Sequence, residues 1–135
     1  MEKLRNIHKW VTTNIKYDCR YHESGRENLE KASYILKKGD GVCSHYAILT
    51  AALCRAAGLP ARIINGPASP SDSTPPVNHA WNEVLINGQW VPVDTCWDAG
   101  YTKDNAFVPA QSTRFLAPSK AVFAKTHTAS VVTLH

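Results

Sequence analysis

The chain has 135 residues, of which 44% are hydrophobic and 19% charged, and its formal net charge is +4. This composition indicates one globular domain over residues 1–135 and excludes disordered and fibrous classes of protein. No apolar run approaches the roughly 20 residues that a membrane helix needs. The N-terminus opens an amphipathic segment rather than a signal peptide. We therefore expect a soluble domain of open localisation, either cytoplasmic or excised from a larger, exported protein.

Basic residues are scattered along the chain, and only Lys37 and Lys38 are adjacent. Nucleic-acid-binding domains gather Lys and Arg on one face or stripe, often with aromatic side chains between them. The pattern here indicates a solvated surface, so we expect neither a nucleic-acid partner nor a membrane segment.

Four cysteines occur, at positions 19, 43, 54 and 96. Their number is too low for the dense disulfide framework of a small secreted domain. No CxxC pair is present, and a metal site built from Cys43, His45, Cys54 and His79 would match no standard ligand spacing. We therefore expect no cofactor and no metal ion.

The first half of the chain predicts three helices. Residues 2–15 carry apolar side chains at helical spacing, and residues 27–38 form a second amphipathic stretch before a tight turn at 39–41. Residues 44–57 are apolar almost all round, which is typical of a buried helix. Gly58 and Pro60 end that helix, and a short strand is expected at 61–65.

Residues 66–77 are rich in Pro and Ser and predict an irregular segment. One interpretation is an ordinary surface loop. The other is a flap beside an active site, because the segment runs directly into His79.

The clearest local signal is a β-hairpin, in which Asn87-Gly88 joins strands at 78–86 and 89–95. Beyond it the sequence is mostly irregular. The remaining elements that we expect are a strand at 114–116, a helix at 119–125 capped by Ser119, and a strand at 130–134.

A two-residue turn fixes the register of this hairpin. Counting outward from the turn places Trp81 opposite Asp94 and His79 opposite Cys96, with all four side chains on one face. Asp94 is then the diagonal neighbour of His79, within reach of a long side chain. The same register puts Pro92 in a non-hydrogen-bonded pair, where its missing N–H is tolerated, especially at a sheet edge.

Cys43 directly precedes the buried helix. A thiol at a helix start lies beside the positive end of the helix dipole and free backbone N–H groups, which favour the reactive thiolate. The same N–H groups can hold the oxyanion of a tetrahedral intermediate. The alternative is that Cys43 is a small buried hydrophobic residue.

His79 and Asp94 complete the arrangement. A carboxylate beside an imidazole orients the ring and stabilises the imidazolium, as in sets of nucleophile, base and orienting acid. The alternative for His79 alone is a buried histidine with a satisfied hydrogen bond. Trp81 either walls the site, where it would contact substrate, or packs in the core.

Several sequence blocks together resemble the transglutaminase-like superfamily, in particular its small microbial members. The resemblance rests on the order of three core blocks and covers most of the chain. The matching segments are residues 41–47 with 53–62, 79–84 with 90–94, and the weaker 10–18, 115–116 and 123–127.

The resemblance implies a papain-like α+β fold, with the nucleophile at the N-terminus of a buried central helix packed on an antiparallel sheet. It implies a catalytic triad of Cys43, His79 and Asp94. Members of the superfamily transfer a glutamine acyl group to an amine or hydrolyse amide bonds.

Two features differ from the superfamily. His45 stands where an acidic or amide residue is frequent, and on a helix it points to nearly the opposite side from Cys43, so we do not expect it to be the base. Calcium sites and CxxC zinc pairs of larger relatives are missing. Tyr17 or Tyr34 could complete the oxyanion hole, although ordinary packing roles are the alternative.

The expected function is therefore cysteine-dependent hydrolase or acyltransferase chemistry on amide bonds, with hydrolysis and transfer both open. The substrate would be a peptide, a protein or a small amide, and further domains could flank this one. A non-catalytic binding module of the same fold is the alternative, although such a module has no need of Cys43, His79 and Asp94.

Overall fold

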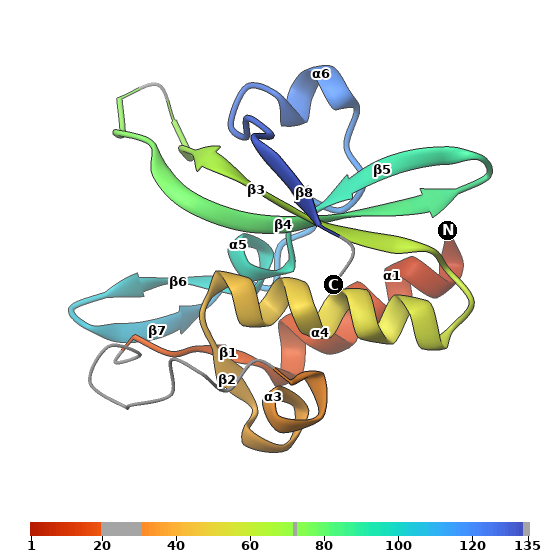
Figure 1. Cartoon of the computed structure of the whole chain (residues 1–135). Coiled ribbons are helices and arrows are strands. Elements are labelled where there is room, and N and C mark those ends of the chain that lie inside the picture. Colours follow the sequence, from red (N-terminus) through yellow and green to blue (C-terminus); the bar gives the residue numbers. More distant parts are fainter. Residues whose placement is uncertain (20–30, 72, 134–135) are drawn as a thin grey trace.

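The computed structural model describes residues 1–19, 31–71 and 73–133. A four-stranded antiparallel sheet with the strand order β5-β4-β3-β8 runs through the molecule (Figure 1). Its strands are Ala61–Ala68 (β3), Val77–Ile86 (β4), Gln89–Val93 (β5) and Val131–Thr133 (β8).

Helices cover both faces of this sheet (Figure 1). On one side lie Glu2–Asn14 (α1), Ala32–Lys38 (α3) and Cys43–Ala56 (α4), and on the other lies Lys120–Phe123 (α6). The expected α+β fold class, with a central helix packed on an antiparallel sheet, is confirmed.

Helix α4 is the centre of the packing on its side of the sheet. Its buried side chains belong to two apolar clusters, one shared with the sheet and one shared with α1 and α3. The amide of Asn82 on β4 donates to the carbonyl oxygen of Ala47 at 2.9 Å and ties the helix to the sheet. The helix ends before Gly58, which has φ +84. The position of Cys43 is thus set by a helix that packs on all sides.

A smaller apolar cluster lies on the opposite face of the sheet. It joins Ile64 and Trp81 from the strands to Phe115 and to Phe123 of α6. Because strand side chains alternate between faces, β3 and β4 contribute to this cluster and also to the cluster that packs between the sheet and α4.

The hairpin of β4 and β5 has the predicted turn and, up to Val93, the predicted register. Asn87 and Gly88 have φ of 51° and 79°, the left-handed values that a two-residue turn requires. Ile86 pairs with Gln89, and Pro92 lies on an edge strand as expected.

The outer part of the predicted register is wrong. The ladder ends at the pair of Asn82 and Val93, so neither Trp81 and Asp94 nor His79 and Cys96 are strand partners. The reason is that Asp94 caps a short helix, Thr95–Ala99 (α5), by accepting the N–H of Trp97.

Other boundaries also differ from the sequence-based expectations. Strand β3 continues to Ala68, three residues into the predicted loop, and residues 69–71 and 73–76 follow without helix or strand. Helix α3 begins at Ala32 after an extended Lys31, and residues 27–30 of the predicted helix lie outside the described residues. Leu116 makes an isolated bridge to Val93 instead of a strand.

Two small sheets were not predicted. Lys16–Tyr17 (β1) pairs in parallel with Asp40–Gly41 (β2), and Gly100–Lys103 (β6) forms a hairpin with Ala106–Pro109 (β7). The turn residues of this hairpin, Asp104 and Asn105, both have positive φ without a glycine, which made the signal weak.

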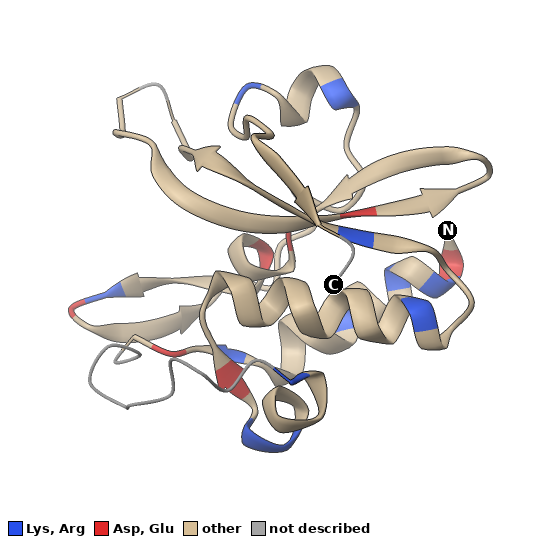
Figure 2. Cartoon of the chain, viewed as in Figure 1, with Lys and Arg blue, Asp and Glu red and all other residues tan. Residues whose placement is uncertain are grey.

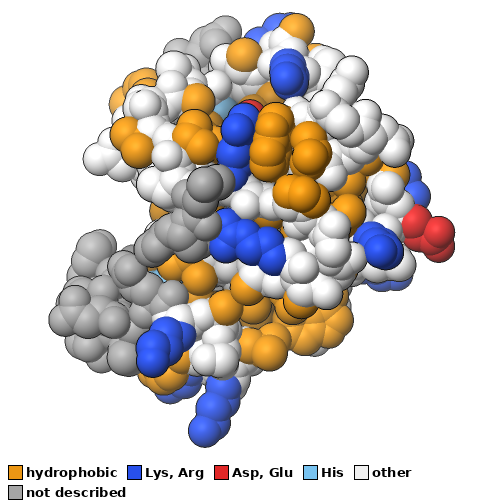
Figure 3. Space-filling view, turned by 45° about the vertical axis from the view of Figure 1, so that its right-hand side comes forward, with side chains coloured by type: hydrophobic (Ala, Val, Ile, Leu, Met, Phe, Trp, Pro, Cys, Tyr) orange, Lys and Arg blue, Asp and Glu red, His pale blue; other side chains and the backbone are white. Residues whose placement is uncertain are grey.

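Charged residues are spread over the molecule. Lys and Arg occur on helices of the lower layer and near α6 (Figure 2), and on the face in Figure 3 they lie apart among hydrophobic and uncharged side chains. No helix in the described part of the chain is both long and apolar enough to span a bilayer.

The packing of α1 gives a stability prediction. Leu4 is fully buried, whereas Leu36 on α3 is 46% exposed. Leu4→Ala should lower the free energy of unfolding by about 2–5 kcal/mol, through lost burial and a cavity. The matched control Leu36→Ala should change it by less than about 0.5 kcal/mol. Urea unfolding measures both, and equal effects would contradict the described core.

Candidate active site

Cys43 is the first residue of α4. Val42 before it is extended, with φ −102° and ψ −175°, and the helix begins at Cys43. Its half-buried thiol therefore lies beside the first-turn N–H groups, which have no partner within a helix. The parallel pair of Tyr17 and Gly41 places a tyrosine close to this helix start.

His79 lies on β4, opposite Gly66 of β3. Its ring is 6% exposed and stacks against the indole of Trp97 at 4.4 Å between ring centroids. The strand pairing and the stack together fix which way the imidazole points.

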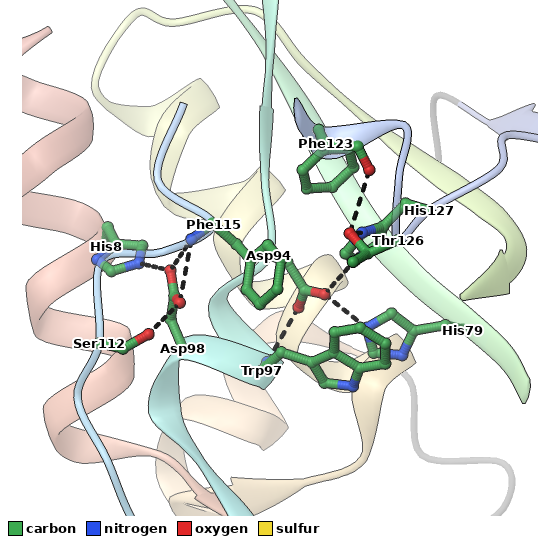
Figure 4. A network of polar contacts seen from close by, with 10 residues as sticks. All are labelled: His8, His79, Asp94, Trp97, Asp98, Ser112, Phe115, Phe123, Thr126 and His127. Atoms are coloured by element: carbon green, nitrogen blue, oxygen red, sulfur yellow. Dashed lines mark hydrogen bonds and ion pairs between the residues drawn. The ribbon is translucent and has the colours of Figure 1, made fainter. Parts of the chain in front are cut away.

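Asp94 is fully buried, and its carboxylate accepts three N–H groups (Figure 4). Oδ1 accepts the backbone N–H of Trp97 at 3.0 Å, in the cap of α5. Oδ2 accepts Nε2–H of His79 at 2.7 Å and Nε2–H of His127 at 2.8 Å. A buried carboxylate with three donors is compensated for its loss of water.

Cys43 and His79 line the same two cavities. Because Nε2 of His79 bonds to Asp94, Nδ1 is the ring nitrogen left for the sulfur. The structure thus gathers the three sequence-predicted residues in one place, where the start of α4, β4 and the cap of α5 meet.

Electrostatic coupling shifts the pKa values of the two partners in opposite directions. Burial disfavours the imidazolium, but the charge and hydrogen bond of Asp94, together with those of Cys43, outweigh burial and raise the pKa of His79 from 6.5 to about 9. Burial also disfavours the carboxylate, but the charge of His79 and the hydrogen bonds of both histidines lower the pKa of Asp94 from 3.8 to about 2. The arrangement therefore favours an imidazolium beside a carboxylate.

Two cavities meet at Cys43 and His79. The larger, of about 550 Å³, has walls that include the aromatic side chains of Tyr17, Trp97 and Phe115. The smaller, of about 420 Å³, is lined by small and polar residues such as Ser44, Asn65, Gly66 and Ser130. Both are open to a ligand, so the thiol and the imidazole lie in one accessible cleft.

The sequence profile of the transglutaminase-like superfamily matches residues 1–95. The chain belongs to this superfamily. Kyphoscoliosis peptidase of mouse and of human is 28% identical over 106 residues, a match that covers 74% of this chain and 16% of the peptidase. This chain therefore spans only a small part of those curated relatives.

Two solved structures share the fold of this chain. A candidate cysteine protease from Cytophaga hutchinsonii superposes with a TM-score of 0.59 and 23% identity, over 96% of this chain and 42% of that one. A TGase superposes with a TM-score of 0.54 and 16% identity, over 76% of this chain and 27% of that one. At these identities the likeness concerns the fold.

The other residues that the sequence singled out lie in different surroundings. Tyr17 lines the larger cavity together with Cys43. Burial, and next the charges of the neighbouring Cys96 and Cys43, raise the pKa of Tyr17 to about 12, so its hydroxyl keeps its proton. Trp81 is 3% exposed and belongs to the apolar cluster with Ile64, Phe115 and Phe123. Its ring centroid lies 6.0 Å from that of His79. This burial favours the packing interpretation.

His45 and Tyr34, the two other residues considered from the sequence, have structural surroundings. The Nδ1 atom of His45 accepts the backbone N–H of Val42 at 3.0 Å, which makes it a helix-capping residue at the start of α4. Tyr34 lies half-buried on α3.

The segment that was suspected to be a flap contributes to the cleft. Pro70, and Val77 at the start of β4, line the larger cavity.

Sequence reasoning missed His127 and Trp97. His127 lies 33 residues after Asp94 and follows the short helix α6, so no spacing rule connects the two. Trp97 is recognisable only once Asp94 is known to cap α5, because the helix then turns the indole toward His79.

A metal ion could be held only by atoms that are spaced for coordination. Among the described residues, His79, Asp94 and His127 place one ligand atom each within 4.8 Å of one another. Ligands about 2.0–2.2 Å from a tetrahedral ion lie roughly 3.3–3.6 Å apart. The N–O distances of 2.7 and 2.8 Å are shorter and fit shared protons instead.

A second buried carboxylate supports the helix that carries Asp94. Asp98 on α5 accepts Nε2–H of His8 at 2.7 Å, the hydroxyl of Ser112 and the backbone N–H of Phe115 (Figure 4). These bonds fasten α5 to α1 and to the segment at 110–115. Because Asp94 caps α5, the buried hydrogen bonds of Asp98 that hold this helix in place also fix the orientation of Asp94.

The pKa shifts of His79 and Asp94 predict how the ion pair between them stabilises the fold at different pH values. The pKa of His79 is raised from 6.5 to about 9, so its contribution should be complete below about pH 6.5 and lost as the pH rises to about 9. The pKa of Asp94 is lowered, so the contribution should also be lost as the pH falls from 3.8 to about 2.

The measurement is the free energy of unfolding of the wild type minus that of His79→Gln, across this pH range. This difference in the free energy of unfolding should be largest between about pH 3.8 and pH 6.5. A difference that grows as the pH rises above 6.5 would contradict an imidazolium paired with Asp94.

Proposed function

We propose that the chain catalyses cysteine-dependent acyl chemistry on amide bonds, as a peptidase-like or amidase-like hydrolase or as a glutamine acyltransferase. Cys43 is the nucleophile, His79 the proton carrier and Asp94 the orienting acid. The observation that carries the proposal is that His79, which is hydrogen-bonded to Asp94, lines the same two cavities as Cys43, at a cleft that a substrate can enter.

The reaction would proceed in two steps. In the first, the thiolate of Cys43 attacks the amide carbonyl carbon, and the C–N bond breaks as the imidazolium of His79 gives its proton to the leaving amine. This leaves a thioester on Cys43. In the second, water or an acceptor amine attacks the thioester, His79 takes the proton of the attacking group, and the sulfur leaves as thiolate.

The charge on the carbonyl oxygen needs hydrogen-bond donors. Backbone N–H groups at the start of α4 are one source, because they lie where the attacked carbonyl must sit. The hydroxyl of Tyr17 is the other proposed source. It lines the same cavity as Cys43, and its raised pKa of about 12 keeps it a donor at neutral pH.

Two observations support a peptide or protein substrate, with a small amide as the alternative. The curated relatives that match three quarters of this chain carry the name peptidase. The cleft also comprises two cavities that share Cys43, one with several aromatic side chains in its walls and one with mostly small side chains. An extended substrate can place its two halves in these cavities, and the acceptor that enters decides between hydrolysis and transfer.

The nucleophile can be tested with a generic acyl donor, before the natural substrate is known. p-Nitrophenyl acetate should give a burst of about one p-nitrophenolate per chain, with an acetyl group on Cys43 in the intact mass. Cys43→Ala should abolish both and keep the wild-type fold by circular dichroism. The control Cys19→Ala, which also removes a half-buried thiol, should leave the burst unchanged.

A full burst in Cys43→Ala would reject the assignment. A wild type that never acylates, with this donor or with peptide and amine libraries, would favour the non-catalytic module instead.

The orienting role of Asp94 predicts a large kinetic effect. Asp94→Asn keeps the shape of the side chain but replaces an acceptor of His79 and His127 by an amide, so the imidazole loses its anchor. We expect the rate of acylation to fall by about 10²- to 10⁴-fold, as in other triads. The control Asp104→Asn, in the exposed turn between β6 and β7, should have no effect. A loss of less than about threefold would contradict the role.

A further inference from the structure

We propose that His127 is a positioning residue for this site, which holds the Asp94 carboxylate ionised and aimed at His79 by donating a second N–H to the same oxygen. The inference rests on the proposed function, in which Asp94 orients the proton carrier. His127 is not among the residues that line the two cavities at Cys43, and it reaches the chemistry through the Asp94 oxygen that also accepts from His79.

The first support is the way the carboxylate is divided among its donors. Oδ1 is taken by the N–H of Trp97, and Oδ2 by His79 and His127. An ionised carboxylate has only acceptors, so each histidine must present Nε2–H to it. With donors on both oxygens, from three directions, rotation of the carboxylate away from His79 breaks at least one further bond.

The second support is that the ring of His127 is held with Nε2 toward Asp94. The hydroxyl of Thr126 donates to the carbonyl oxygen of Phe123 at 3.1 Å and lies 2.7 Å from Nδ1 of His127. A hydrogen-bond partner on one ring nitrogen orients the imidazole and so fixes the direction of the other. Thr126 thus anchors the ring in the orientation that the carboxylate needs.

The third support is the backbone that carries His127. On its two sides, the N–H of Ser69 donates to the carbonyl of Thr126 at 2.8 Å, and the N–H of Thr128 donates to the carbonyl of Pro67 at 3.0 Å. Gly66 allows this approach, because a Cβ there would lie 1.9 Å from the Thr128 oxygen. Gly66 is also the strand partner of His79, so strand β3 sets both histidines relative to each other.

The fourth support is the surroundings of the His127 ring, whose side chain is fully buried. The ring of Phe123 stacks on it at 3.9 Å and 16°, while Trp81 of β4 and Trp97 of α5 contact it at 4.8 and 4.9 Å. The titratable groups that face it in the described structure are Asp94 and His79. Hydrogen bonds in such apolar surroundings are strong, and a missing donor is costly.

These contacts lead to a kinetic consequence. Without the donor from His127, the carboxylate takes up a proton more easily or turns, and the imidazolium of His79 is less stabilised. The loss falls on proton transfer, so kcat should decrease while KM changes little.

The test compares His127→Phe, which keeps an aromatic ring against Phe123 but has no donor, with His127→Gln, whose amide can place an N–H near the position of Nε2. The readout is the rate of Cys43 alkylation by anionic iodoacetate divided by the rate with neutral iodoacetamide. This ratio reports the imidazolium beside the sulfur, because only the anion is attracted by its charge. It needs no substrate and can be followed across pH.

In the wild type the ratio should fall as the pH rises past about 9, where His79 loses its proton. In His127→Phe the fall should occur about one pH unit lower, and kcat for p-nitrophenyl acetate should drop about 10- to 100-fold. In His127→Gln, the pH at which the alkylation ratio falls and the value of kcat should both return most of the way to those of the wild type. Thr126→Val, which removes only the hydroxyl, should shift the ratio in the same direction by a smaller amount.

A folded His127→Phe with the pH profile and kcat of the wild type would overturn the inference. If His127→Phe does not fold, an unchanged profile in Thr126→Val overturns it. Failure of the proposed function has a different signature, because the wild type itself would then show no burst and no dependence of the alkylation ratio on pH.

Discussion

A single buried carboxylate determines how this site is organised. Asp94 loses all contact with water and is compensated by three N–H donors, from the backbone of α5 and from two histidines. Since the backbone donor fixes the carboxylate within the cap of α5, the histidines must come to it. The fold therefore has to bring β4 and the segment after α6 to the start of one short helix, and the position of His79 relative to Cys43 follows from that requirement.

The core elements meet this requirement through rigid packing. Helix α4 presents Cys43 from a helix that is buried between two apolar clusters, and the hydroxyls of Thr50 and Thr95, 3.0 Å apart, tie it to α5. Asp98 fastens the same short helix to α1. A nucleophile and an orienting acid that are 51 positions apart in sequence are thereby placed on one connected frame, which is how a reactive geometry is held without substrate.

Much of the site could be predicted from sequence because its signals are local. The helix start at Cys43, the Asn87-Gly88 turn and the alternation along β4 each follow from short-range rules. Asp94 was assigned correctly as the neighbour of His79 but for a partly wrong reason, since it lies beyond the ladder and caps a helix. The contact of His127 with Asp94 was not predicted, although the family resemblance includes residues 123–127, because its approach depends on Gly66 and on backbone pairing with β3, which are long-range contacts without a sequence period.

The central claim is that the thiol of Cys43 and the imidazole of His79 act as one unit, and the rate of Cys43 alkylation by iodoacetamide in the wild type and in His79→Gln tests it most directly. At about pH 6 the account predicts that the wild-type thiol reacts at least about tenfold faster than the same thiol in the variant, because the positive charge of the neighbouring imidazolium favours the reactive thiolate. Equal rates in two folded proteins would show that the sulfur and the ring are neighbours without chemical coupling, and would contradict the account.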